Sequence, residues 1–296
     1  MTAKIIDGKQ IAADMRAKLR TDVAALAKKG IVPGLGVILV GDDPASKSYV
    51  TAKQKACEEI GIYSEDNRLS ASIPQNQLMA HINRLNKDPR IHGILTQLPL
   101  PKHFDELEVL MAIDPAKDVD GFHPINVGKM VTGQKAFLPC TPHGVVQILI
   151  KSGVKIEGAS VVIVGRSNIV GKPLANILIQ KSPLGNATVT VCHTRTRNLA
   201  EHTKRADIVI AAAGHPNTIT ADMIKDGAVV IDVGVNRVED STKKAGYRLV
   251  GDVDFENVKE KASLITPVPG GVGPMTITML LYNTVESAKH AAGLLK

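Results

Sequence analysis

Residues 159–173 read ASVVIVGRSNIVGKP, and this stretch decides the fold class. Its first half is a β-branched run typical of a buried strand, and its second half turns at Gly165 and enters a helix with Pro173 in the first turn. Free amides at a helix N-terminus beside a flexible glycine meet the physical requirement for holding a pyrophosphate. The spacing is Gly-x-Ser-x-x-x-Gly rather than Gly-x-Gly-x-x-Gly, so the turn alone is weak evidence and can be purely structural.

Three more apolar runs follow this turn, with helical segments between them. They are NATVTVC (186–192), ADIVIAAAG (206–214) and GAVVIDVG (227–234). Strands covered by helices on both faces are continuously apolar, so four such runs in this order predict a doubly wound parallel sheet.

The first half of the chain shows the same alternation of helix and strand. The patterns predict an amphipathic helix over 10–29, a buried strand over 34–40, a helix after Pro44 and a second strand over 91–97. Further along, PCTPHG (139–144) is typical of a break before the next helix, and the tail from Thr276 is expected to be one final helix.

The predicted fold class is α/β. We expect two α/β domains with a cleft between them, the second a Rossmann-like doubly wound parallel sheet. The expected domains are residues 1–140, joined by the C-terminal helix 275–296, and a nucleotide-binding domain over 141–274.

Composition excludes several classes of protein. The 296 residues are 44% hydrophobic, which is too apolar for a disordered chain, and no apolar run approaches the ~20 residues of a membrane span. The start, MTAKIIDGKQIAADM, lacks the apolar stretch of a signal peptide, so we expect a soluble, cytoplasmic protein. The three cysteines show no metal-ligand spacing with the histidines, and no metal site is predicted.

The net charge of +7 favours anionic partners. Aromatic residues make up only 3% of the chain and no basic run occurs, so nucleic acid is not an expected partner and anionic small molecules are.

The strand that follows the glycine turn indicates which dinucleotide binds. NAD-selective folds usually end this strand with a carboxylate for the ribose hydroxyls. Here the strand is followed by HTRTR (193–197), which holds Arg195 and Arg197 and no acid. Together with Arg166 in the turn, these side chains favour NADP over NAD, because they suit a 2′-phosphate. The alternative, that the arginines are ordinary solvent-exposed residues of a loop, remains open.

A Tyr-x-x-x-Lys pair, Tyr49 and Lys53, lies in the helix after Pro44. Residues four apart share one helix face, and short-chain reductases use such a pair beside the nicotinamide. In those enzymes the pair follows the nucleotide turn within one domain, whereas Lys53 precedes Gly165 by 112 residues. The short-chain interpretation therefore fails. Both side chains are expected at the margin of the helix's buried stripe, where a cleft could lie.

Six motifs occur in a characteristic order along the chain. They are YVTAK (49–53), ILTQLPLP (94–101), DVDGFHP (118–124), PCTP (139–142), GRSNIVGKP (165–173) and TPVPGGVGPMT (266–276). Over essentially its whole length the chain closely resembles the bifunctional methylenetetrahydrofolate dehydrogenase/methenyltetrahydrofolate cyclohydrolase family. The resemblance implies NADP-dependent oxidation of 5,10-methylenetetrahydrofolate, hydrolysis of the product to 10-formyltetrahydrofolate, and a homodimer. The implied partner is a folate, with or without a polyglutamate tail, and neither nucleic acid nor membrane.

The resemblance also implies roles for particular residues. Lys53 would be the main catalytic group, Gln97 its hydrogen-bonding partner, Tyr49 a stacking wall and Asp120 the pterin anchor. The rest of the folate site would include Pro269, Gly270 and Gly273. The nucleotide site would include Gly165, Arg166, Ser167, Thr194 and Ile231, to which Arg195 is added for its charge.

Each of these roles has a plainer alternative. Asp118 competes with Asp120 as the anchor, although a loop cap suits it better. Gln97 could bond only to the backbone that follows it, Lys53 could be a solvated surface lysine, and Pro269–Gly273 could be a sharp turn as well as a ligand contact.

Two rival functions also fit parts of the pattern. One is a different two-domain NADP oxidoreductase, such as one like shikimate dehydrogenase, but it does not account for PVPGGVGPMT. The other is a catalytically silent dinucleotide-binding regulator, and the presence of Lys53, Gln97 and Asp120 argues against it.

Overall fold

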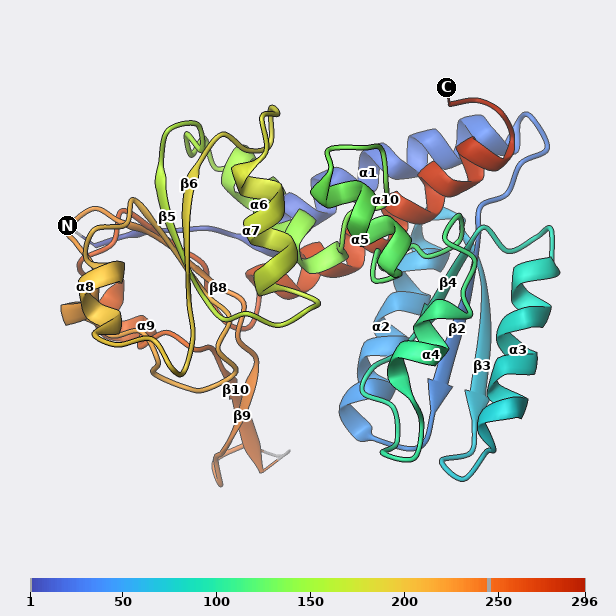
Figure 1. The fold of residues 1–296 in the computed structure, drawn as a ribbon, viewed down its shortest axis with the longest axis horizontal. Coiled ribbons are helices and arrows are strands. Elements are labelled where there is room, and N and C mark those ends of the chain that lie inside the picture. Colours follow the sequence, from blue (N-terminus) through green and yellow to red (C-terminus); the bar gives the residue numbers. More distant parts are fainter. Residues whose placement is uncertain (1, 244–245, 296) are drawn as a thin grey trace. The chain divides into compact units, whose positions relative to one another are not determined.

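The computed structural model describes residues 2–243 and 246–295. Backbone contacts divide the chain into two compact units (Figure 1). The three-stranded unit comprises residues 13–140 and 277–296, and the six-stranded unit comprises residues 1–12 and 141–276. Two long helices, α1 (Gly8–Ala27) and α10 (Val272–Ala291), contribute residues to both units.

The three-stranded unit is built on a parallel sheet in the order β3-β2-β4. Its strands are β2 (Gly34–Val40), β3 (Tyr63–Leu69) and β4 (Gly93–Thr96). The central strand β2 is buried along its whole length, as its apolar run predicts. The helices of this unit are α2 (Pro44–Ile60), α3 (Gln75–Lys87), α4 (Glu106–Met111) and α5 (Pro124–Val131).

Helix α2 carries the predicted buried stripe. Val50, Cys57 and Ile60 are all buried. The helix begins where the Asp43 side chain accepts a hydrogen bond from the backbone N–H of Ser46, and it ends at Gly61, whose φ of 83° is left-handed. These caps set where the helix begins and ends, and its buried stripe sets the direction of the polar side chains beside it.

The six-stranded unit has a fully parallel sheet in the order β1-β11-β8-β7-β5-β6. Its strands are β1 (Lys4–Ile5), β5 (Ser160–Val164), β6 (Thr188–Cys192), β7 (Ile208–Ala211), β8 (Val229–Asp232) and β11 (Leu264–Ile265). The chain runs outward from β5 to β6 and then returns to the other side of β5 with β7. This reversal is the switch point of a doubly wound sheet, so the predicted fold class is confirmed.

Shorter elements complete the six-stranded unit. The helices are α6 (Cys140–Lys151), which starts at the unit boundary, α7 (Gly171–Ile179), α8 (Leu199–Thr203) and α9 (Phe255–Val258), with a 3₁₀ turn at Ala221–Met223. Strands β9 (Asn236–Glu239) and β10 (Tyr247–Val250) form a separate antiparallel pair that extends away from the parallel sheet (Figure 1).

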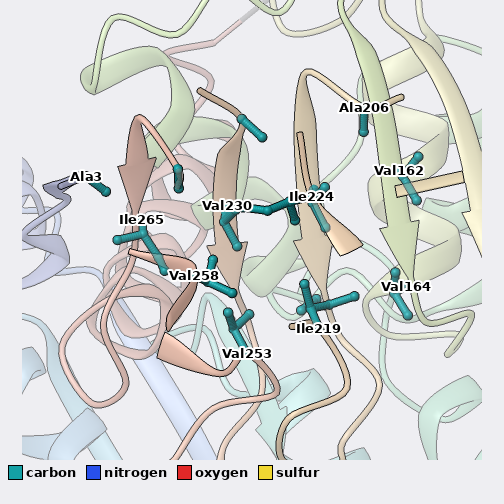
Figure 2. Close-up of a cluster of buried hydrophobic side chains, with 14 of the residues drawn as sticks. Ala3, Val162, Val164, Ala206, Ile219, Ile224, Val230, Val253, Val258 and Ile265 are labelled. Carbon is teal, nitrogen blue, oxygen red and sulfur yellow. The ribbon is translucent and has the colours of Figure 1, made fainter. Parts of the chain in front are cut away.

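Figure 2 shows the apolar core of this unit. Val162 and Val164 of β5, Val230 of β8 and Ile265 of β11 belong to this core, and side chains from the connecting segments, such as Ile224, pack with them. Strand β7, which lies between β5 and β8, adds Val209 and Ala211. Only β6, at the sheet edge, departs from the expected continuous burial, because it has a partner strand on one side alone.

Several boundaries differ from those expected. Helix α1 spans Gly8–Ala27 rather than 10–29, and strand β4 spans Gly93–Thr96 rather than 91–97. Helix α6 begins at Cys140, inside the PCTPHG segment taken for a break, because Pro142 lies in the first turn, where a helix makes no use of its N–H. Helix α10 begins at Val272 rather than Thr276. Strand β1 pairs with β11 and joins the six-stranded unit, although the predicted first domain included it.

The predicted extent of the two functional domains remains a prediction. Among the described residues, no helix combines the length and the apolar character that crossing a bilayer requires.

Candidate active site

The three-stranded unit brings Lys53 and Gln97 together. Lys53 lies on α2 and is only 8% exposed, which rules out the solvated surface lysine. Its Nζ donates a hydrogen bond of 3.0 Å to Oε1 of Gln97, the residue that follows β4. The Gln97 Nε2 donates to the Leu98 carbonyl at 2.7 Å. This second bond orients the amide so that its oxygen faces the ammonium. Gln97 therefore bonds both to Lys53 and to the backbone that follows it, as the two interpretations of the sequence suggested.

Asp118 and Asp120 have different roles. Asp118 is buried, and its carboxylate accepts hydrogen bonds from the backbone N–H of Phe122, the backbone N–H of His123 and Nδ2 of Asn126. The carboxylate oxygens of Asp118 accept these hydrogen bonds within the loop, so the interpretation of Asp118 as a loop cap is confirmed.

Asp120 is partly buried beside the lysine. Burial raises the pKa of its carboxyl group to about 6, while the positive charge of Lys53 acts in the opposite direction. A carboxylate held beside a buried ammonium can accept two parallel N–H groups from a planar ligand. Lys53 is thus bonded to Gln97 and lies near enough to Asp120 for its charge to lower the pKa of that carboxyl group.

Two residues behind Asp120 were not predicted from the sequence. Cys140 is buried, its Sγ donates to the Val119 carbonyl at 3.3 Å, and its interaction with the Asp120 carboxyl lowers the pKa of that group. Asn283 of α10 donates from Nδ2 to the carbonyls of Val119 at 2.8 Å and Leu138 at 3.0 Å. Asn283 could have been found from the sequence, because an asparagine on the buried face of an apolar helix needs hydrogen-bond partners.

Tyr49 precedes Lys53 by one turn of α2, and its ring is exposed. Its position on the same face fits a wall against which a flat ring can stack, and this role remains a prediction.

The glycine turn after β5 is shaped by two close backbone approaches. Gly165 has a φ of 142°, and a Cβ there would lie 2.1 Å from the carbonyl oxygen of Ala212. A Cβ on Gly171, the first residue of α7, would lie 2.1 Å from the oxygen of Gly165. Ser167 Oγ accepts a hydrogen bond from the Val170 N–H at 3.1 Å, so the missing middle glycine is replaced by a cap.

This turn fits a phosphate group. Among the described residues, the backbone N–H groups of Arg166 and Ile169 have no protein acceptor, and both precede the N-terminus of α7. Unpaired amides at a helix N-terminus are suited to anionic oxygens.

The loop after β6 lies beside that turn, because Val164 and Cys192 are paired in the sheet. The loop is held by His193, whose Nδ1 accepts from the Arg195 N–H at 3.1 Å. Thr194 and Arg195 are exposed, as is Arg166. The carboxyl edge of the sheet therefore presents two guanidinium groups and a hydroxyl, and HTRTR holds no acid that would oppose a 2′-phosphate.

The role of Ile231 in the nucleotide site remains a prediction. Its side chain is fully buried in β8, where the residue pairs with Ile210. The exposed apolar side chain near this strand is Val235, four residues further on and past the carboxyl end.

Pro269, Gly270 and Gly273 belong to the six-stranded unit. Gly270 has a φ of 110°, a backbone conformation that side chains disfavour, so glycine is required there whether or not a ligand binds. Gly273 lies in the first turn of α10, and a Cβ there would meet no atom within 4 Å. The loop is therefore a sharp turn, and its predicted contact with the folate remains a prediction that this turn allows.

No cluster of His, Cys, Asp and Glu side chains able to hold a metal ion occurs in the part of the chain that the structure describes.

Comparison with known proteins identifies the family. The family model described as "Tetrahydrofolate dehydrogenase/cyclohydrolase, catalytic domain" matches residues 6–120, and the corresponding "NAD(P)-binding domain" matches residues 139–292. The chain belongs to the tetrahydrofolate dehydrogenase/cyclohydrolase family. The resemblance carried by the six motifs is confirmed, and the alternative like shikimate dehydrogenase is set aside.

Relatives within this family align along nearly the whole chain. The "Bifunctional protein FolD" of Syntrophus aciditrophicus is 61% identical over 294 residues, covering 99% of this chain and all of that protein. The crystal structure of the Campylobacter jejuni bifunctional enzyme has a TM-score of 0.92 at 51% identity, covering 97% of this chain and 99% of that one. The Trypanosoma brucei enzyme, complexed with NADP cofactor and inhibitor, has a TM-score of 0.94 at 41% identity, with 99% of each chain covered.

A substitution in the glycine turn tests its backbone requirement. We expect Gly165→Ala to destabilise the protein by about 3 kcal/mol or more, because its Cβ would overlap the Ala212 carbonyl, and to weaken NADP binding. Gly158→Ala is the matched control, since Gly158 has a φ of 75° but open space around an added Cβ. It should cost only about 1 kcal/mol. Thermal melting and NADP titration compare the two variants, and equal losses would contradict the proposed overlap.

Proposed function

We propose that this chain is a bifunctional methylenetetrahydrofolate dehydrogenase and methenyltetrahydrofolate cyclohydrolase. It oxidises 5,10-methylenetetrahydrofolate to 5,10-methenyltetrahydrofolate with NADP and hydrolyses that product to 10-formyltetrahydrofolate. The observation that carries the proposal is the buried Lys53 ammonium, hydrogen-bonded to Gln97 and next to Asp120, in a chain that matches both domains of the family.

The oxidation needs alignment more than it needs proton chemistry. NADP, when bound, supplies the acceptor for a hydride from the methylene carbon, and the lone pair of a folate nitrogen drives its departure. Asp120 is the group that orients the pterin, by accepting two of its N–H groups in parallel. Tyr49 stacks on the folate, so that the protein's main contribution is the placement of the reacting carbon.

The hydrolysis requires proton transfer at the same carbon. Water adds to the methenyl carbon and loses a proton, and one carbon–nitrogen bond then breaks as a proton reaches the departing nitrogen. The Lys53 Nζ is the group placed to carry that proton, and the bond to Gln97 holds it in position.

For the nucleotide, we propose that the Gly165–Ser167 turn holds the pyrophosphate. Arg166 and Arg195 hold the 2′-phosphate, and Thr194 lies beside them at the sheet edge. Ile231 of β8 belongs to the same proposed site, and the exposed Val235 past the end of that strand adds an apolar contact.

We also propose a cytoplasmic homodimer that acts on folates with or without a polyglutamate tail. All three cysteines are free and buried, which supports a reducing compartment. Light scattering should give twice the 31.5 kDa of the chain.

One assay tests the central proposal. Purified protein is mixed with methylenetetrahydrofolate and NADP, and absorbance is followed at the wavelengths of NADPH and of the methenyl product. NADPH should form, and added methenyltetrahydrofolate should be hydrolysed faster than without protein. Failure of either reaction would remove the corresponding activity from the proposal.

The raised pKa of Asp120 makes folate affinity pH-dependent. Only the ionised carboxyl group accepts two N–H bonds, and it becomes protonated as the pH falls through about 6. Tetrahydrofolate affinity should therefore be level above about pH 7 and fall about tenfold for each pH unit below about 6. Calorimetric titration across this range measures the profile. In Asp120→Asn the inflection should vanish, and a flat profile in the unmodified protein would contradict the role of Asp120.

A further inference from the structure

A pocket of about 760 Å³ lies at the amino edge of the three-stranded sheet. Its wall includes residues 30–32 before β2, Tyr63 at the start of β3 and residues 89–92 before β4. The three strands are parallel, so these segments lie at the edge opposite Gln97, which follows β4. The pocket is therefore separate from the Lys53 cluster, and its volume is typical of a small-molecule site.

The lining of the pocket is apolar with a positive bias. Isoleucine, valine, proline and alanine supply seven of the fourteen lining residues, and the basic side chains among the others are Arg90, Lys117, His92 and His290. None of the fourteen lining residues is an aspartate or a glutamate. A solute that combines an apolar body with a negative charge complements this surface.

The Nζ of Lys117 supplies the first N–H group in the pocket that has no acceptor in the part of the protein that the structure describes. Its Nζ donates to the carbonyls of Leu85 at 3.1 Å and Asp88 at 2.9 Å, which leaves one of three protons. Burial lowers the pKa of Lys117, and among the described residues the ammonium forms no ion pair with a carboxylate. The charges of Asp114 and Asp88 act on the ammonium without a direct ion pair, and an anion in the pocket would be a direct partner. Arg90, in contrast, is already paired with Asp88 at 2.7 Å.

His92 supplies the second donor. Its Nδ1 accepts a hydrogen bond from the Gly34 N–H at 3.1 Å, so the ring proton is on Nε2. Burial lowers the pKa of His92, which favours this neutral form. Within the described residues the Nε2–H has no acceptor.

We propose that this pocket binds a small organic anion with an apolar body, whose carboxylate accepts hydrogen bonds from Lys117 and His92. The apolar body lies against the exposed side chains of Val32 and Tyr63. The site is distinct from the proposed folate and nucleotide sites, and its occupancy does not depend on either activity.

Phenylacetate is the probe, and binding is measured by calorimetric titration. We expect it to bind at least about tenfold more tightly than acetate, which lacks the apolar body, and than phenylacetamide, which lacks the charge. Binding should persist when the protein is saturated with NADP and tetrahydrofolate. Absence of phenylacetate binding, equal binding of phenylacetamide, or displacement by tetrahydrofolate would overturn the proposal.

Substitutions locate the site. Lys117→Met should weaken phenylacetate binding at least about tenfold. Since Lys117 also links two backbone segments, the second variant is Val32→Glu, which places a negative charge in the pocket at a side chain that is 51% exposed. Val131→Glu is its control, because Val131 is 50% exposed and lies outside the lining. Val32→Glu alone should abolish binding, and equal affinity in the two glutamate variants would overturn the assignment.

Discussion

Lys53→Met is expected to lose cyclohydrolase activity by about 10²- to 10⁴-fold, the usual contribution of a group that transfers protons. Methionine has a similar volume and suits a position that is only 8% exposed, so the fold should be kept. It cannot donate to Gln97 Oε1 or carry a proton to and from water. Hydrolysis of methenyltetrahydrofolate, followed as the loss of its absorbance, measures the effect.

The control for this variant lies on the same helix. Lys55→Met removes an exposed lysine two residues further along α2 and should leave both activities within about twofold. NADP and tetrahydrofolate affinities, measured directly, should be retained in Lys53→Met. Undiminished hydrolysis in Lys53→Met, or an equal loss in Lys55→Met, would refute the catalytic assignment.

Arg166→Ala should weaken NADP binding by about 10- to 100-fold, because a charge-assisted bond to the 2′-phosphate is worth about 1.5–3 kcal/mol. NAD lacks this phosphate, so its affinity should fall by less than about threefold. Direct titration of both dinucleotides gives the selectivity ratio. The same loss for NADP and NAD would show that Arg166 acts on the turn rather than on the 2′-phosphate.

Arg205→Ala provides the comparison for charge alone. Arg205 is an exposed arginine of the same unit that follows α8 and lies outside the glycine turn. Its removal lowers the net charge equally and should leave the selectivity ratio unchanged. A change of the same size in this variant would mean that long-range charge, and not a local contact, sets the preference for NADP.

Local patterns in the sequence predicted most of the fold. The continuous apolar runs gave four parallel strands of the six-stranded unit, β5, β6, β7 and β8, and the glycine turn after β5 lies where the sequence indicated it. The edge pairing of β1 was not predictable, because two residues, Lys4 and Ile5, carry no periodicity. The start of α6 was missed since a proline in the first turn of a helix resembles a break.

The candidate site was predicted unevenly. The motif match named Lys53, Gln97 and Asp120, and the structure brings these three together. It also separates the two aspartates, since the hydrogen bonds of Asp118 are all internal. The supporting contacts of Asn283 escaped prediction, because its acceptors, the carbonyls of Val119 and Leu138, lie more than a hundred residues away in the chain.

The amino-acid sequence by itself determined the alternation of helix and strand, the glycine turn after β5, the lack of an acid after β6 and the family of the chain. Each of these depends on neighbouring residues or on short motifs, which a linear pattern records. Tertiary structure alone decided that Lys53 is buried against Gln97, that Asp118 is a cap and that the Ile231 side chain is enclosed. Burial and pairing depend on which distant segments meet, and contacts of that kind leave no periodic trace in the chain.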